Sequence, residues 1–235
     1  MIRDSLLDAL AVLLPADCPA CGSPARAGPC DGCRVDAAEA ALPGRRLLGP
    51  EDHPLDVVTG AAYAGVVRRL VLALKDEGRV GAAAPLAVLL RPALRLALGG
   101  EPAVLVGPPG SYGRRLRRGY DPVALILRAA GARPAHTLRR ARHSRDQVGL
   151  GRVERRGNLD GAFRARRPLE GSPSILLVDD VVTSGATLLE MRRALEAAGG
   201  RVRGAVAVAG TPLRAETGLP GVSPAAPMVL GMNAR

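Results

Sequence analysis

Two adjacent acids and a hydroxyl-rich loop follow an apolar run in the stretch ILLVDDVVTSGAT. The acids are Asp179 and Asp180, and the loop after them contains Thr183, Ser184, Gly185, Ala186 and Thr187. Hydroxyls, a glycine that lets backbones approach closely and the free N–H groups of a helix start together suit an anion. Because carboxylates repel a phosphate placed directly on them, we expect the acids to accept hydrogen bonds from hydroxyls one sugar away. The stretch therefore predicts a site for a phosphorylated sugar.

The flanking patterns predict which elements hold this site. Residues 175–178 are short, apolar and partly β-branched, which is typical of a central strand in a parallel sheet. After Gly185 the apolar positions recur at helical spacing and end at the pair Gly199 and Gly200. Strand, loop and helix in this order form half of a βαβ unit, so the acids should lie at the carboxyl edge of the sheet. The predicted fold class is α/β with a parallel sheet flanked by helices.

Two other interpretations fit parts of the stretch. An acid pair also ends a strand in phospho-acceptor receiver domains, but there most of the sheet follows the acids. Here only one further strand, VRGAVAVAG, remains. Alternatively, the acids are solvated loop residues and the glycine only makes a turn, which fits either feature alone better than both in register.

A second group of reactive side chains lies near the start of the chain. Four cysteines form two Cys-x-x-Cys knuckles separated by eight residues: Cys18, Cys21, Cys30 and Cys33. This spacing can place four thiolates around one tetrahedral ion, and Zn²⁺ is the metal that it favours. Two disulfides are the alternative, and they require an oxidising compartment.

The residues before the cysteines bear on the compartment. MIRDSLLDALAVLLPADC superficially resembles a signal sequence, yet Asp4 and Asp8 interrupt its apolar run and Asp17 precedes the first cysteine. We interpret the segment as an amphipathic helix to about Leu14. No stretch is expected to reach membrane-spanning length, so a cytoplasmic protein with a structural zinc ribbon is predicted.

The chain is expected to consist of three parts. Its 235 residues, 47% of them hydrophobic, suffice for one α/β core with a small appendage. The parts are a helix and zinc ribbon at 1–41, the α/β domain at 56–212 and a tail at 213–235 that we expect to be disordered. A Pro/Gly/Arg-rich connector is expected near 42–55. Within the domain, further strands are expected near 57–63, 103–107 and 202–209, with helices ending near Lys75 and covering 85–98.

ILLVDDVVTSGAT resembles the signature of the type I phosphoribosyltransferases, which bind 5-phosphoribosyl 1-pyrophosphate. The resemblance implies that Asp179 and Asp180 hold the ribose 2′ and 3′ hydroxyls, and that the loop after them wraps the 5′-phosphate. It also implies Mg²⁺ bound with this ligand. The loop PPGSYGRRLRRG occupies the position of the family's pyrophosphate loop, where Arg117 or Arg118, of which we favour Arg118, is expected to contact pyrophosphate.

Cysteine knuckles ahead of such a domain resemble the ComF family of competence-associated proteins. Three further stretches resemble blocks of that family: AAYAGVVRRLVLALKDEGR, RRLRRGYDP and RDQVGLGRVERRGNLDGAF. In the first of them we take Lys75 as substrate-binding. The resemblance covers about residues 15–212 and places a flexible hood at 139–158. The sequence departs from the family at Tyr120, Asp121 and Pro122, where Phe-Asn-Gln is usual. The resemblance implies a role in DNA uptake beside a helicase-like ATPase.

The charge of the chain has a plain compositional component. The formal charge is +11, and the basic residues are 32 arginines and one lysine amid abundant Ala, Gly and Pro, which suggests GC-rich coding. Residues 114–167 hold 16 arginines against four acids, so this segment could face a pyrophosphate or a nucleic-acid backbone. The alternative is that these arginines form a solvated basic surface with no anionic ligand. Three tyrosines and one phenylalanine leave little material for base stacking.

Three functions follow as hypotheses, with the oligomeric state left open. The first is a phosphoribosyltransferase acting on an unidentified acceptor. The second is a binding protein that senses phosphoribosyl pyrophosphate in DNA uptake. The third is a zinc- and arginine-based nucleic-acid module in which the sugar-phosphate site is vestigial, with single-stranded DNA as the partner considered.

Overall fold

The computed structural model describes residues 16–25, 28–110, 119–141 and 159–211. At its centre is a five-stranded sheet with the order β3-β4-β9-β8-β5. The four parallel strands are β4 (Leu55–Ala62), β9 (Val202–Gly210), β8 (Ile175–Val182) and β5 (Val104–Val106). β3 (Ala41–Leu48) runs antiparallel to β4 on one edge. The predicted α/β class with a parallel-rich sheet is confirmed.

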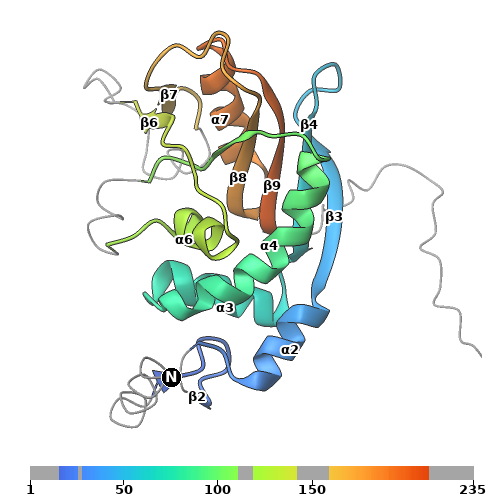
Figure 1. Ribbon diagram of the computed structural model, residues 1–235, viewed down its shortest axis with the longest axis vertical. Helices are drawn as coiled ribbons and strands as arrows, with labels where there is room; N and C mark the ends of the chain where they lie inside the picture. Colours follow the sequence, from blue (N-terminus) through green and yellow to red (C-terminus); the bar gives the residue numbers. More distant parts are fainter. Residues whose placement is uncertain (1–15, 26–27, 111–118, 142–158, 212–235) are drawn as a thin grey trace, which may run out of the picture.

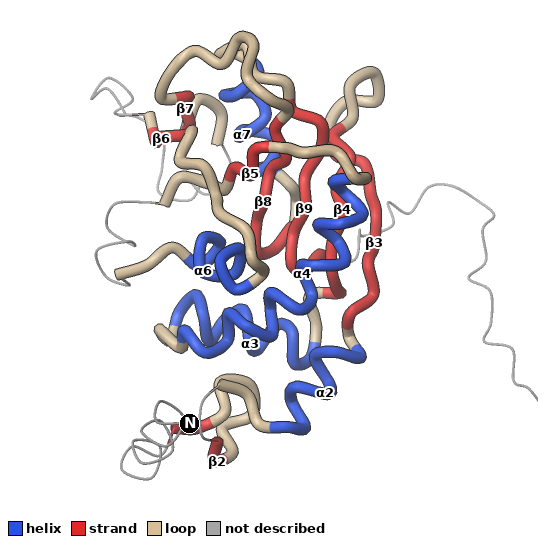
Figure 2. The backbone as a smooth tube through the Cα atoms, viewed as in Figure 1, coloured by secondary structure: helices blue, strands red, loops and turns tan. Residues whose placement is uncertain are grey.

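Helices cover both faces of this sheet (Figures 1 and 2). One face carries α3 (Gly65–Asp76), α4 (Ala83–Leu98) and α6 (Pro122–Ala129), and the other carries α7 (Ala186–Glu196). Strand β8 shows why both faces need cover. Leu176 and Val178 pack on the side of the three helices, whereas Ile175 and Leu177 pack on the side of α7. Alternate residues of a strand point to opposite faces, so a continuous apolar run is buried only between two layers.

Two strand boundaries differ from those predicted. β8 continues beyond residue 178 to Val182, because β9 pairs with it as far as Gly210. The two acids therefore lie within the carboxyl-terminal half of the strand rather than just after it. β3 occupies the first half of the expected connector at 42–55. An edge strand with largely exposed side chains lacks the apolar alternation by which a strand is recognised.

One helical stretch, Val80–Leu98, is long and apolar enough by length and composition to cross a membrane. The prediction that no stretch reaches that length is therefore wrong. This stretch includes the short 3-10 helix η1 (Val80–Ala82) and α4. Leu86, Leu89 and Leu90 are fully buried against the rest of the domain. The apolar composition of α4 is thus that of a core helix.

The cysteine-rich segment forms a small module on the same core. It contains a short hairpin, β1 (Ala16–Asp17) with β2 (Pro24–Ala25), and the helix α2 (Asp31–Glu39). A Cβ added at Gly81 of η1 would lie 3.0 Å from the Gly28 Cα, so backbone meets backbone where the module contacts the domain. Arg79 also donates a hydrogen bond to the Cys18 carbonyl at 3.0 Å. The predicted helix before residue 15 and the predicted tail at 213–235 lie outside the described residues.

Candidate functional site

The two acids are held at the carboxyl edge of the sheet by their own backbone. Asp179 Oδ1 accepts the N–H of Asp180 at 2.8 Å, and Asp180 Oδ1 accepts the N–H of Val181 at 2.7 Å. Both side chains are buried, with 8% and 6% of their surface exposed. Both of these backbone contacts use the Oδ1 atoms. β5 pairs with β8 only as far as Leu177. The part of β8 that carries the acids therefore extends beyond its pairing with β5.

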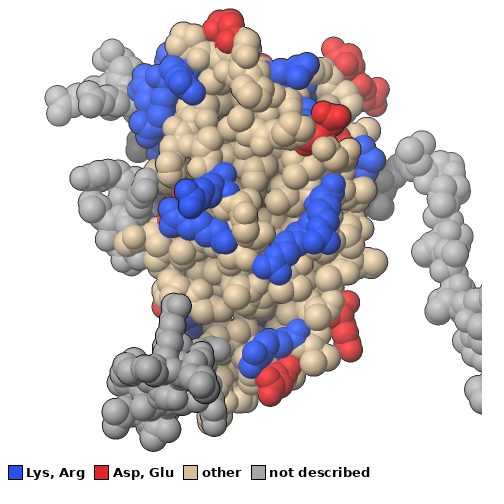
Figure 3. Space-filling model, in the orientation of Figure 1, with Lys and Arg blue, Asp and Glu red and all other residues tan. Residues whose placement is uncertain are grey.

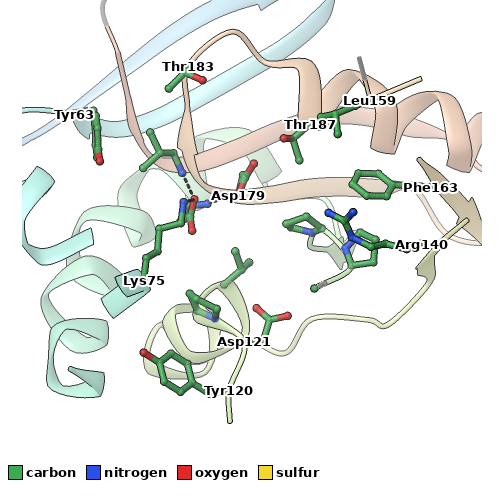
Figure 4. Close-up of a pocket in the computed structure, with 17 residues that line it drawn as sticks. Tyr63, Lys75, Tyr120, Asp121, Arg140, Leu159, Phe163, Asp179, Thr183 and Thr187 are labelled. Carbon is green, nitrogen blue, oxygen red and sulfur yellow. Dashed lines mark hydrogen bonds and ion pairs between the residues drawn. The ribbon is translucent and has the colours of Figure 1, made fainter. Parts of the chain in front are cut away.

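Lys75, in the last turn of α3, reaches this acid pair. Its Nζ lies 2.8 Å from Asp180 Oδ1 (Figure 4). Burial by itself would lower the pKa of Lys75, but the charges of Asp180 and Asp179 outweigh it and the pKa is raised. Burial raises the pKa of Asp179 well above its usual range, and the adjacent Asp180 charge adds to this effect, whereas Lys75 opposes it. One lysine therefore faces two buried carboxylates, which disfavours full ionisation of the pair.

These residues line a cavity of about 450 Å³ at the edge of the sheet. Lys75 and the acids form one side of it, and Arg140 and Phe163 lie on the opposite side (Figure 4). Pro108 and Gly110, which follow β5, contribute to its wall. A cavity of this size with a few polar groups is typical of a small-molecule site.

The predicted anion loop continues from the acids into α7. Thr183 and Thr187 line the main cavity, and a smaller recess of about 30 Å³ is enclosed by Asp179 and residues 181–188, including Ser184, Gly185 and Ala186. Gly185 is the N-cap of α7 with a φ of 79°, a conformation that favours glycine. A Cβ at this position would lie 2.3 Å from Leu48 Cδ1. Both the turn and the close approach of β3 therefore require glycine here.

A buried network fixes the wall opposite the acids. Phe163 begins β7 (Phe163–Ala165), which pairs with β6 (Leu138–Arg140), and the Arg140 guanidinium lies 5.7 Å from its ring centre. Glu190 of α7 accepts the N–H of Phe163 at 2.9 Å and is paired with Arg193 at 2.6 Å. Burial would raise the pKa of Glu190, but the Arg193 hydrogen bond and the Phe163 N–H lower it overall. An ionised carboxylate thus ties β7 to the helix that follows the anion loop.

The residues that depart from the usual Phe-Asn-Gln block have structural roles. Asp121 Oδ1 accepts the N–H of Ala124 at 3.1 Å and caps α6, and Pro122 begins that helix, where its missing N–H is not needed. The Tyr120 hydroxyl donates to the Leu74 carbonyl. Tyr120 and Asp121 also line the main cavity. The replacement therefore builds a capped helix beside the site.

Two predictions about this region concern residues outside the described part of the chain. Arg118 and most of its loop fall within 111–118, and most of the predicted hood falls within 142–158. No local sequence pattern assigns a site role to Arg140, Phe163, Leu48 or Glu190. Phe163 stands only within a family block, and Leu48 lies in the expected connector. Long-range contacts such as that of Leu48 with Gly185 leave no local pattern in the sequence.

The four cysteines lie together in the N-terminal module. Their Sγ atoms are all within 4.8 Å of one another, and the Cys21 and Cys30 Sγ atoms are 3.6 Å apart. All four are free thiols, with Cys18 and Cys33 buried. Burial would raise the pKa of Cys18, but hydrogen bonds from the backbone of Cys30, Ala20 and Cys21 outweigh it and lower the pKa to about 6. Four clustered thiols, one of which readily ionises, could hold a zinc ion.

Comparison with known proteins places the chain among relatives linked to DNA. No protein-family model matches the sequence. The chain is 31% identical over 175 residues to the DNA utilization protein YhgH of Salmonella typhimurium, covering 71% of this chain and 77% of that protein. It is 30% identical over 105 residues to competence protein F of Haemophilus influenzae, covering 42% of this chain and 46% of that protein.

Solved structures offer a weaker likeness. The crystal structure of a phosphoribosyltransferase from Corynebacterium diphtheriae is 19% identical, with 76% of this chain and 96% of that chain covered and a TM-score of 0.36. Orotate phosphoribosyltransferase of Mycobacterium tuberculosis is 17% identical over the same shares, with a TM-score of 0.35. These values are too low to assign any residue of this chain. On its sequence relatives, the chain belongs to the ComF family, which includes the DNA utilization protein YhgH and competence protein F.

Proposed function

We propose that the protein binds 5-phosphoribosyl 1-pyrophosphate in the cavity at the edge of the sheet. The observation that carries this proposal is the juxtaposition of a buried acid pair with an anion loop in one cavity. Asp179 and Asp180 would accept hydrogen bonds from the ribose 2′ and 3′ hydroxyls through the Oδ2 atoms that their backbone contacts leave open. The loop from Thr183 to Thr187 would take the 5′-phosphate with its hydroxyls and the N–H groups that begin α7.

The charges around the cavity fit this ligand from end to end. The ribose needs acceptors, which the acids supply, and the pyrophosphate needs cations. Lys75 lies beside the acids and Arg140 lies across the cavity. Mg²⁺ entering with the ligand would offset part of the negative charge of the pyrophosphate. Arg118 is proposed to contact the same pyrophosphate.

The chemistry that we propose for this ligand is transfer of its phosphoribosyl group to an unidentified acceptor. Pyrophosphate would leave C1 of the ribose through a transition state with positive charge on the ring. The buried carboxylates would favour that charge while holding the ring in place. Cations at the other end would offset the negative charge that develops on the departing pyrophosphate. The alternative is a sensor that binds the ligand without turning it over.

Calorimetric titration tests the binding proposal. Phosphoribosyl pyrophosphate with Mg²⁺ is titrated into the zinc-loaded protein and into an Asp179→Asn, Asp180→Asn double variant. A Glu51→Gln, Asp52→Asn variant is the matched control, since it removes an adjacent acid pair from the exposed turn between β3 and β4. We expect saturable binding in the wild type and the control, and none in the Asp179, Asp180 variant. Absence of binding to folded wild-type protein would refute both the transferase and the sensor.

Turnover separates the two forms of the proposal. Pyrophosphate release that depends on an added acceptor would support the transferase, whereas binding without release would favour the sensor. A panel of nucleobases, nucleosides and single-stranded oligonucleotides supplies the candidate acceptors. The Asp179→Asn, Asp180→Asn variant sets the background rate, because it lacks the proposed ribose contacts.

A second candidate function, binding of single-stranded DNA, is favoured by one feature of the β6–β7 ribbon. Arg139 and Arg164 lie directly opposite each other in its register, an arrangement of like charges that destabilises a ribbon. Arg166, Arg167 and Arg193 join them around a groove of about 590 Å³ beside α7. In Figure 3, which has the orientation of Figure 1, Lys and Arg side chains gather at the upper left, where Figure 1 shows β6 and β7. They recur as separate patches elsewhere on the face that this view shows. A phosphodiester backbone in the groove would relieve the repulsion.

Fluorescence anisotropy with a labelled oligothymidylate tests this second function. Arg139→Glu, Arg164→Glu should weaken binding and flatten its dependence on salt concentration, because fewer phosphate contacts release fewer counterions. The control variant, Arg91→Glu with Arg95→Glu, makes the same change of charge on α4, which covers the opposite face of the sheet. Equal loss in both variants would show general attraction to a basic protein and would exclude a groove. The names of the relatives support a DNA-uptake context, in which we propose a cytoplasmic protein working beside a helicase-like ATPase.

A further inference from the structure

Strand β3 packs against the start of the loop from Thr183 to Thr187 through residues on one face of the strand. Alternate residues of a strand point to the same side. Gly44 lies against the Thr59 side chain, Arg46 reaches the ends of β8 and β9, and Leu48 lies against Gly185. The edge strand thus turns its α7-facing side toward the start of the loop that follows the acids.

Arg46 joins the last residue of β8 to the residue that follows β9. Its guanidinium donates to the Val182 carbonyl at 2.8 Å and to the Thr211 carbonyl at 2.9 Å. The Val182 carbonyl also accepts the N–H of Thr211 at 3.0 Å. Val182 is the last residue of β8 and directly precedes Thr183. The position at which the loop leaves the sheet is therefore set by Arg46 together with β9.

The charge of Arg46 has no anionic partner within the described residues. The adjacent Arg45 forms a bidentate pair with Asp56, at 2.8 and 2.7 Å, on the exposed side of the strand. Arg46 instead contacts two neutral carbonyls, and its Nε is buried without a hydrogen-bond partner. Burial lowers the pKa of Arg46, which reports the cost of placing this charge there. Arg46 is only partly buried, but a partly desolvated positive charge without an anion beside it is still unfavourable.

An anion in the recess of the loop would supply the missing counter-charge. The recess of about 30 Å³ is enclosed by residues 181–188, and Val182, which Arg46 contacts, is one of them. We propose that Arg46 is a positioning residue for the 5′-phosphate loop, which holds the Val182 carbonyl in place and offsets the charge of a bound phosphate from behind the loop. This inference rests on the proposed function, since it concerns the phosphate end of the same ligand.

Titration with ribose 5-phosphate, a probe that carries the phosphate and lacks the pyrophosphate, tests the inference. Arg46→Met keeps an unbranched apolar chain in place of the arginine stem and removes the charge and the donors. Hydrogen bonds to charged groups are strong enough that their loss should weaken binding about tenfold to a hundredfold. Arg45→Met is the matched control on the same strand, and its affinity should equal that of the wild type.

Arg46→Lys distinguishes positioning and charge from a merely structural role. Lysine keeps the charge but cannot fork to both carbonyls, so its affinity should fall between those of the wild type and Arg46→Met. Wild-type affinity in Arg46→Met would overturn the inference and leave the proposed function standing. Failure of the wild type itself to bind either phosphoribosyl pyrophosphate or ribose 5-phosphate would instead refute the proposed function. Should Arg46→Met not fold, wild-type affinity in Arg46→Lys would overturn the inference.

Discussion

Gly185→Ala should destabilise the fold more than the same substitution at a glycine with an equal backbone conformation. Gly185 and Gly78 have φ values of 79° and 75°. A side chain in this left-handed region costs roughly 1–2 kcal/mol at either position. At Gly78 no heavy atom lies within 4 Å of the added Cβ, whereas at Gly185 the Leu48 Cδ1 lies 2.3 Å away. Carbon atoms prefer about 3.5–4.0 Å, so Leu48 or the loop must move by more than about 1 Å.

The overlap sets the size of the difference. Overpacking of a core typically costs about 1–3 kcal/mol, so Gly185→Ala should lower the free energy of unfolding by about 2–5 kcal/mol. Gly78→Ala should lower it by about 1–2 kcal/mol. Urea unfolding of the zinc-loaded variants measures both values. In a double-mutant cycle, Leu48→Ala should remove part of the cost of Gly185→Ala. Equal destabilisation by the two alanine substitutions would refute the packing of β3 against the loop.

Three further predictions concern stability. Burial and Asp180 raise the pKa of Asp179 in the folded protein. Above the pKa of an unfolded aspartate, about 3.9, the folded protein therefore retains a proton that the unfolded chain has lost. The free energy of unfolding consequently falls as pH rises. Asp179→Asn should therefore increase the free energy of unfolding in urea at neutral pH, with the gain vanishing in acid; no gain at neutral pH would contradict this. Removal of zinc by a chelator, or Cys33→Ser, should lower the urea midpoint, and an unchanged midpoint with no bound zinc would argue against a structural ion. Glu190→Ala leaves the Phe163 N–H unpaired and should cost about 1–3 kcal/mol, whereas a near-neutral result would mean that water replaces the carboxylate.

The site elements that the sequence predicted are those with strong local patterns. A continuous apolar run predicted β8, and helical spacing after Gly185 predicted α7. The Cys-x-x-Cys knuckles predicted a cluster of four thiols, which the structure confirms. In each case the residues that form the feature are near neighbours in the chain, so their spacing alone carries the information.

Features that depend on distant contacts were missed or misplaced. β3 was assigned to a connector because its side chains are mostly exposed, and its position is fixed by pairing with β4. The end of β8 was set too early because pairing with β9 extends it. Arg46 and Glu190 could not be distinguished from the many other charged residues, since their partners lie far away in the sequence.

A crystal structure of the protein with Mg²⁺ and phosphoribosyl pyrophosphate would show where this ligand binds. We expect the ribose hydroxyls within hydrogen-bond distance of Asp179 and Asp180, and the 5′-phosphate within the loop from Thr183 to Thr187. A ligand bound elsewhere, or one with its pyrophosphate in that loop and its ribose away from the acids, would refute the proposed site.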